Sequence, residues 1–317
     1  MDATDLPQSR SLSFNGALTC MILATALWAL SFVAPLWLDA CSPVEITVGR
    51  FFFYGLVSIA ALLTRYRNMR LRSGHWMRAA LYGFVGNILF SLLVSFGVQD
   101  TGAEVVVPIT GLIPICISVA GSGALTASAW RKLLVPFLML AIGLGVVLVV
   151  QSGILDHDAR LSWPGVGAVV VTVVTWTWYA LSNARFLRAH PSISGAQWSC
   201  AVGAATFALG AVIVCVASLS GHGLASSASI FHGQSGVLFM LTSAALGLGA
   251  SWFGAVLFNR ASHVLPMSLV GQLIVLETVF GIVYTCMWKQ TMPPITQAAG
   301  MVLAIAGIWL SARELLK

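Results

Sequence analysis

The sequence contains few charged residues. Only 8% of its 317 residues are Asp, Glu, Lys or Arg, whereas 58% are hydrophobic, and soluble domains are roughly a quarter charged. This composition excludes an ordinary soluble domain. No polar segment is long enough to hold a soluble core, so we expect the whole chain to form one membrane domain. The net charge of +6 is interpreted as topological bias and not as a nucleic-acid-binding surface.

Residues that usually build enzyme sites are few and scattered. The six cysteines lie in or at the ends of apolar segments without CxxC spacing, which favours packing roles over disulfides or a metal site. The six histidines fall between the apolar segments, so a zinc-dependent membrane enzyme is not indicated. The absence of a Gly-rich loop ending in Gly-Lys-Ser/Thr disfavours an ATP-driven pump. We therefore expect no enzyme activity, no metal and no cofactor.

Ten apolar stretches are long enough to cross a membrane. About twenty residues, each rising ~1.5 Å in a helix, span a hydrocarbon layer of ~30 Å. They predict an all-α membrane protein with ten transmembrane helices, and residues 1–15 show no cleavable signal peptide. The stretches are residues 16–38, 46–64, 79–99, 105–127, 133–153, 163–184, 196–218, 236–258, 264–288 and 294–312.

Lys and Arg are concentrated at the termini and in every second connection between these segments. Thirteen of the sixteen lie at the termini or in connections after even-numbered segments, Arg160 and Lys289 lie in odd-numbered connections, and Arg50 lies within a segment. Because Lys and Arg concentrate in cytoplasmic loops, both termini are predicted to be cytoplasmic and the chain to lie in the cell membrane. The cluster from Arg65 to Arg78 is interpreted as a topogenic loop; an RNA or anionic-lipid site is the alternative.

The ten segments divide into two halves of five, residues 1–153 and 161–317. Short matches recur in the same order: Trp-Ala-Leu-Ser at 28–31 resembles Tyr-Ala-Leu-Ser at 179–182, and Leu-Ala-Ile occurs at 140–142 and 303–305. A repeat with an odd number of helices enters the membrane from opposite sides in its two copies. We therefore predict inverted repeats, which support alternating access to a site near the midplane; a duplicated bundle without transport activity is the alternative.

At these positions the chain resembles the drug/metabolite transporter superfamily, and within it the EamA-type transporters with ten helices. The resemblance covers nearly the whole chain. It implies secondary transport of small metabolites, amino acids or drug-like compounds, commonly outward and without ATP hydrolysis. The chain has Thr-Ala-Ser at 126–128 and Lys-Gln-Thr at 289–291 where the fourth and ninth helices of these families often close with Leu-Gly-Glu. The resemblance rests on residues 27–32, 43–46, 50–51, 101–114, 276–280 and 300–307.

Arg50 and Glu277 are the candidate polar anchors of a substrate site. Arg50 lies a few residues inside the second segment, and Glu277 lies about halfway along the ninth. Charged groups in spanning segments normally face the protein interior or a wet cavity. Arg50 could bind a substrate carboxylate, pair with Glu104 or Glu45, or extend to the headgroups. Glu277 could carry a proton, bind a substrate amine or join helices. Together the two residues suit a zwitterion.

Aromatic, amide and proline residues supply further candidates. Trp176 and Tyr179 are three residues apart and share a helix face, so they could line a cavity or pack between helices. Pro108 and Pro114 interrupt backbone hydrogen bonds within one segment and are candidate hinge or gate residues. The remaining cavity candidates are Trp28, Asn87, Asn183 and Gln272.

The sequence therefore predicts a secondary transporter that exports small organic metabolites such as amino acids by alternating access. The alternatives are an efflux carrier of hydrophobic drugs and a non-transporting membrane protein. The expected partners are a small-molecule substrate and the lipid bilayer, not nucleic acid. The sequence carries no indication of the oligomeric state.

Overall fold

The protein is a bundle of long apolar helices. The structure, a computed structural model, describes residues 12–38, 41, 43–101, 106, 109–121, 126–152, 162–219 and 233–315. Within these residues every element is helical, and eight helical stretches are long and apolar enough to cross a membrane. The helices are α1 (Phe14–Trp37), α2 (Pro43–Leu63), α3 (Ser73–Gly83), η1 (Phe84–Leu89), α4 (Phe90–Thr101), α6 (Ile113–Gly121), α7 (Ala127–Ser152), α8 (Trp163–Ala189), α9 (Gly195–Leu219), α10 (Gly233–Ala244), η3 (Ala245–Phe253), α11 (Gly254–Val264), α12 (Met267–Lys289) and α13 (Ile295–Leu315).

Two of the long stretches change helix type in the middle. α3, η1 and α4 form one run over 73–101, and α10, η3 and α11 form another over 233–264; η1 and η3 are π-helical. π-Helical segments are rare and often lie at functional sites. Both contain glycines at close contacts: a Cβ on Gly86 would lie 2.8 Å from the ring of Tyr179, and one on Gly247 would lie 2.6 Å from the backbone of α2.

Several helices extend beyond the segments that hydropathy predicts. The predicted segment 236–258 ends too early, because the helix continues to Val264 and the next begins at Met267. Pro266 is the N-cap of α12, and a proline disfavours helical conformation in the residue before it. The proline therefore sets this boundary, and the polar residues after 258 remain helical.

The fourth predicted segment, 105–127, is described in part. α6 covers only Ile113–Gly121, and a turn at 111–112 precedes it. Pro114 is buried and is the second residue of α6, a position where a missing amide hydrogen breaks no helical bond. Pro108 lies outside the described residues.

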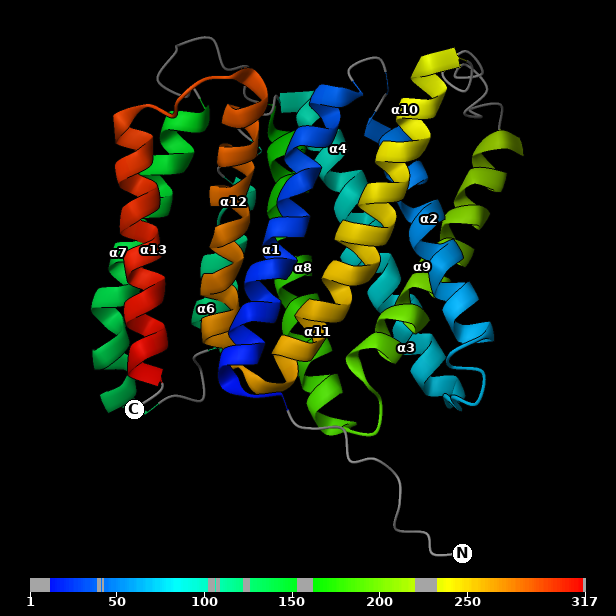
Figure 1. The fold of residues 1–317 in the computed structure, drawn as a ribbon, viewed down its shortest axis with the longest axis horizontal. Helices are drawn as coiled ribbons and strands as arrows, with labels where there is room; N and C mark the ends of the chain where they lie inside the picture. Colours follow the sequence, from blue (N-terminus) through cyan, green and yellow to red (C-terminus); the bar gives the residue numbers. More distant parts are fainter. Residues whose placement is uncertain are drawn as a thin grey trace, which may run out of the picture.

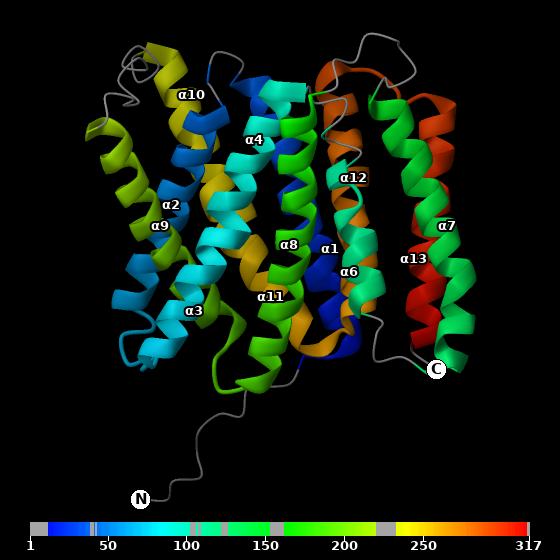
Figure 2. The same cartoon turned by 180° about the vertical axis from the view of Figure 1, so that it is seen from behind.

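The helices stand side by side, and helices from the two halves of the chain are interleaved (Figures 1 and 2). α7 and α13 form a pair at one edge, α2 and α9 pack together toward the other, and α1, α8 and α12 lie between them. α1 begins and α13 ends at the same end of the bundle, where α2 also connects to α3 (Figure 1). The arginine-rich connection is thus at the end from which α1 starts.

Glycines permit close contact at three helix crossings. A Cβ on Gly143 would lie 2.5 Å from the carbonyl oxygen of Gly300, and a Cβ on Gly300 would lie 2.8 Å from that of Gly143. Small residues stabilise membrane helix pairs because they bring backbones into van der Waals contact. The glycines at these crossings are Gly55 and Gly203 between α2 and α9, Gly121 and Gly271 between α6 and α12, and Gly143 and Gly300 between α7 and α13.

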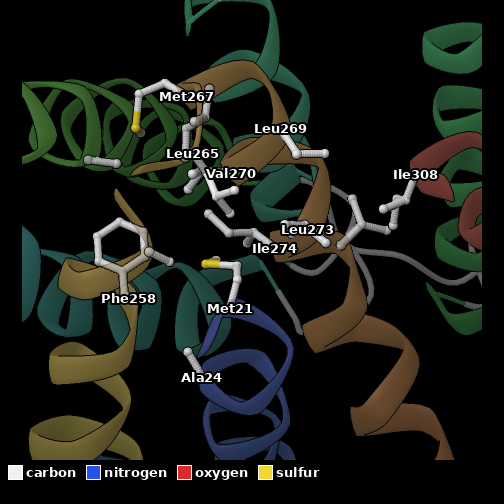
Figure 3. Close-up of a cluster of buried hydrophobic side chains, with 14 of the residues drawn as sticks. Met21, Ala24, Phe258, Leu265, Met267, Leu269, Val270, Leu273, Ile274 and Ile308 are labelled. Atoms are coloured by element: carbon white, nitrogen blue, oxygen red, sulfur yellow. The ribbon is translucent and has the colours of Figure 1, made fainter. Parts of the chain in front are cut away.

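The largest buried apolar cluster surrounds the first half of α12. Val270 and Ile274 of α12 belong to it with Met21 of α1, Phe258 of α11 and Ile308 of α13 (Figure 3). In lipid this packing stabilises through van der Waals contact more than through the hydrophobic effect. Contacts from three neighbouring helices therefore fix α12, the helix that carries Glu277.

The crossing of α7 and α13 makes a testable prediction. Gly143→Ala should lower the free energy of unfolding by about 1–3 kcal/mol, because the added methyl would overlap the backbone of Gly300 and Ala304. Gly145→Ala, two residues further along, meets nothing within 4 Å and should be neutral or slightly stabilising. Melting temperatures in detergent micelles measure the difference, and equal melting of the two variants would contradict the close contact.

Candidate functional site

Arg50 joins three helical segments at one guanidinium. Its Nε donates a hydrogen bond of 2.7 Å to Oγ of Ser251 in η3, and its Nη1 donates one of 3.1 Å to Oγ of Ser31 in α1. The ring of Phe51 lies 5.9 Å from the guanidinium carbon. Arg50 therefore faces neighbouring helices, and its two protein acceptors are neutral hydroxyls.

Glu277 is the acidic counterpart of Arg50. It lies near the middle of α12 and is partly buried. Arg50 and Glu277 attract each other electrostatically, although the hydrogen bonds of Arg50 go to the two serines. Among the described residues, Glu277 lies farther from the ends of its spanning stretch than any other charged side chain. The structure thus brings the two predicted anchors into one electrostatic environment.

The aromatic candidates form a connected series. Trp28 and Trp176 pack edge to face with centroids 6.5 Å apart, and Trp176 packs on Tyr179 at 5.9 Å. All three side chains remain partly exposed. Trp28 precedes Ser31 by three residues, so the two share one face of α1. The aromatic series therefore lies next to the Arg50 hydrogen bonds.

Asn87 lies in η1 and is bonded to the other half of the chain. Its Nδ2 donates a hydrogen bond of 3.0 Å to Oγ1 of Thr206 in α9. Asn87 remains partly exposed. Both π-helical segments thus make a polar contact with a helix of the opposite half, η1 with α9 and η3 with α2.

Asn183 belongs to a separate buried network. Its Oδ1 accepts a 2.7 Å hydrogen bond from Nε1 of Trp198, and its Nδ2 donates one of 2.9 Å to Oδ1 of Asn259. Nδ2 of Asn259 donates in turn to the carbonyl of Gly195 at 3.4 Å. These bonds join α8, α9 and α11, and they use both polar atoms of Asn183.

Gln272 is fully buried, and neither polar atom of its amide has a hydrogen-bond partner among the described residues. Ser268 lies one turn earlier in α12, and its buried hydroxyl also has no partner within the described part of the chain. Residues four apart lie on the same helix face. The two side chains therefore form a polar strip on α12.

Sequence patterns missed several polar partners. Ser31, Ser251 and Thr206 bind predicted residues, yet serine and threonine are common in membrane helices and carry no distinctive spacing. Tyr54 follows Arg50 by one turn of α2, and its hydroxyl donates a 2.9 Å hydrogen bond to the carbonyl of Ser199 in α9. Tyr54 lies four residues after Arg50, and this spacing could have predicted that the two share one face of the helix. In the described part of the chain, His, Cys, Asp and Glu form no group that could hold a metal ion.

Comparison with known proteins identifies the family. Residues 15–151 match the EamA-like transporter family. The chain is also 31% identical to the inner membrane protein YtfF of Escherichia coli strain K12 over 299 residues, which covers 92% of this chain and 93% of that protein. The chain belongs to the EamA-like transporter family. Its resemblance to the drug/metabolite transporter superfamily is therefore confirmed.

Membership of the EamA-like family indicates a multi-pass membrane transporter of small molecules, and transporters of this family are generally not enzymes. A crystal structure with 19% sequence identity covers 96% of this chain and 100% of its own, with a TM-score of 0.75. At that identity the likeness supports the fold alone. The helical bundle of this EamA-like protein is thus shared with a solved structure.

The buried amide network predicts a stability effect at Asn183. Asn183→Ala should lower the free energy of unfolding by about 1–2 kcal/mol, because the indole N–H of Trp198 loses its acceptor and Asn259 loses its donor. Thr175→Ala is the control, since the Thr175 hydroxyl donates to backbone carbonyls of its own helix. The melting temperatures of the two variants in detergent micelles measure the difference. An Asn183 variant as stable as the Thr175 variant would show that the network does not stabilise the fold.

Proposed function

We propose that the protein is a secondary transporter that exports a zwitterionic metabolite such as an amino acid by alternating access. The observation that carries the proposal is the placement of Arg50 of α2, which donates hydrogen bonds to the neutral hydroxyls of Ser31 and Ser251 within a spanning stretch and interacts electrostatically with Glu277 of α12. A carboxylate of the substrate would replace the serine hydroxyls at Arg50, and its amine would bind Glu277. Outward transport is the direction that the family resemblance implies.

The proposal includes ten membrane spans arranged as two inverted repeats. Beyond the eight candidate spans, α9 is 25 residues long, and the segment that contains α6 would supply the tenth. Corresponding segments cross each other at α2–α9, α6–α12 and α7–α13. The first segment of each half also contacts the third segment of the other, through α1–α11 and α8–α4. Reciprocal contacts of this kind support a pseudo-twofold axis in the membrane plane.

The proposed cavity would be lined by α1, α2, the run from α3 to α4, α6, α8 and α12. Trp28, Trp176 and Tyr179 would contact the apolar part of the substrate, since their rings remain partly exposed. Asn87 would hydrogen bond to it, whereas both polar atoms of Asn183 are already bonded to protein. Gln272, Pro108 and Pro114 would contribute to the moving parts of α12 and of the fourth segment.

The competing proposal is an efflux carrier of hydrophobic drugs. The partly exposed aromatic series favours it, because stacking and edge contacts bind flat apolar molecules. The two proposals can be separated by measuring extracellular metabolites. The measurement compares cells that lack the protein with cells that overproduce it. Enrichment of an amino acid in the medium supports the first proposal. Resistance to several hydrophobic compounds without such enrichment supports the second.

Substitution of the two anchors tests the proposed site. Arg50→Ala and Glu277→Gln should each lower export at least tenfold, because one charge-assisted hydrogen bond contributes about 1.5–3 kcal/mol. Arg50→Lys should recover only part of the activity, since the planar two-donor geometry is lost. Arg185→Ala, which removes an exposed charge near the end of α8, is the control. Full export by both the alanine and glutamine variants would overturn the proposal.

Reporter fusions test the proposed orientation. Green fluorescent protein fused after Lys317 should fluoresce and alkaline phosphatase at the same position should be inactive, because the alternation of Lys and Arg predicts a cytoplasmic C-terminus. Alkaline phosphatase fused after Asp158, in the connection between the halves, should be active. Ten spans and a cytoplasmic N-terminus would place the C-terminus in the cytoplasm. An active phosphatase after Lys317 would therefore contradict this topology.

A further inference from the structure

A shallow, wide-open hollow of about 410 Å³ lies on the exposed face of α3, and its described lining residues all belong to that helix. The exposed fraction is 76% for Met77 and 46% for Leu81. Ala79 and Tyr82, on the other face of the helix, are buried. The hollow therefore faces the surroundings of the bundle and is separate from the Arg50 and Glu277 site. Its lining residues are Ser73, Gly74, Met77, Arg78 and Leu81.

Polarity changes along this exposed face. The stretch 73–94 is a candidate membrane span, and its exposed face begins with Ser73 and Arg78 and continues with Leu81 and Phe84. At ~1.5 Å per residue, the distance from Ser73 to Phe84 is about 16 Å, close to half of the ~30 Å hydrocarbon layer. The face thus has a polar end and an apolar continuation, and the two together have about the length of one leaflet.

The polar end lies within a strongly basic segment. Residues 65–78 include five arginines, and residues 46–99 include no Asp or Glu. The connection between α2 and α3 lies at the same end of the bundle as the start of α1 (Figure 2). Each Arg or Lys near a membrane surface attracts anionic lipid by about 1 kcal/mol. The local charge therefore favours an anionic partner.

Among the residues that the structure describes, Arg78 contacts an aromatic ring at the hollow and no anionic side chain accepts a hydrogen bond from it. Its guanidinium carbon lies 5.1 Å from the ring centre of Phe186, and Phe186 packs on Trp198 at 4.2 Å. The ring fixes the cation through a cation–π contact and accepts no conventional hydrogen bond. The guanidinium keeps its donors for a ligand with phosphate geometry. Gly74 leaves the adjacent space open, because a Cβ there meets nothing within 4 Å.

We propose that this hollow binds an anionic phospholipid. The headgroup phosphate accepts hydrogen bonds from Arg78 and Ser73, and one acyl chain lies along Met77, Leu81 and Phe84. A lipid accounts for both ends of the face, whereas free phosphate would leave the apolar stretch unused. The site is independent of the transported substrate.

Native mass spectrometry of the purified full-length chain tests the proposal. The probes are dioleoyl phosphatidylglycerol, dioleoyl phosphatidylcholine and inorganic phosphate. The wild-type chain should retain phosphatidylglycerol at least tenfold more than phosphatidylcholine. Arg78→Gln should reduce that retention about tenfold through loss of a charge-assisted contact. Gly74→Leu should reduce it to a similar extent by filling the hollow.

Two matched controls isolate the site. Arg131→Gln removes an exposed arginine near the start of α7, and Gly167→Leu adds a side chain where a Cβ also meets nothing. Both should retain lipid like the wild-type chain. Equal retention of the two lipids, equal loss in Arg78→Gln and Arg131→Gln, or displacement of phosphatidylglycerol by inorganic phosphate alone would each overturn the proposal.

Discussion

An arginine inside a membrane must be solvated by the protein, and this requirement organises the centre of the bundle. A charged side chain is expensive in hydrocarbon unless neighbouring groups satisfy it. Arg50 meets the requirement by binding Ser31 of α1 and Ser251 of η3. The approach of η3 to α2 depends on Gly247, because any Cβ there would overlap the backbone of Arg50. The solvation of one cation thus joins α1, α2 and η3 near Trp28.

The all-helical membrane bundle could be predicted from the sequence because lipid imposes simple rules, whereas the ten spans, their inverted repeats and their orientation stay predictions. The length of apolar segments and the bias of Lys and Arg depend on the bilayer and not on details of packing. Helix ends and helix type depend on single residues instead. Pro266 ends a helix that hydropathy ends at 258, and the π-helical segments η1 and η3 have no periodicity that distinguishes them from α-helix.

The candidate site could be predicted only where residues depart from the apolar pattern. Arg50 and Glu277 are evident because each places a charge within an apolar segment. Asn87 and Asn183 have the same chemistry and similar sequence surroundings, yet Asn87 binds Thr206 at a π-helical segment and Asn183 bonds to two side chains of a buried network. Their difference arises from which helices lie opposite them. The neighbouring helices are determined by tertiary packing, and residue spacing within a single helix does not predict them.

Arg50 and Arg188 differ in the chemistry of their hydrogen-bond partners. Arg188 donates to the carbonyl oxygens of Ser262 and Leu265, which lie at a helix end and need donors. Moving Arg188 would leave these acceptors unsatisfied. The serine hydroxyls at Arg50 can turn to other acceptors, because a hydroxyl both donates and accepts. A carboxylate can accept two parallel hydrogen bonds from one guanidinium, whereas each serine hydroxyl accepts one from Arg50. The proposed exchange of protein partners for a substrate carboxylate therefore fits Arg50 better than Arg188.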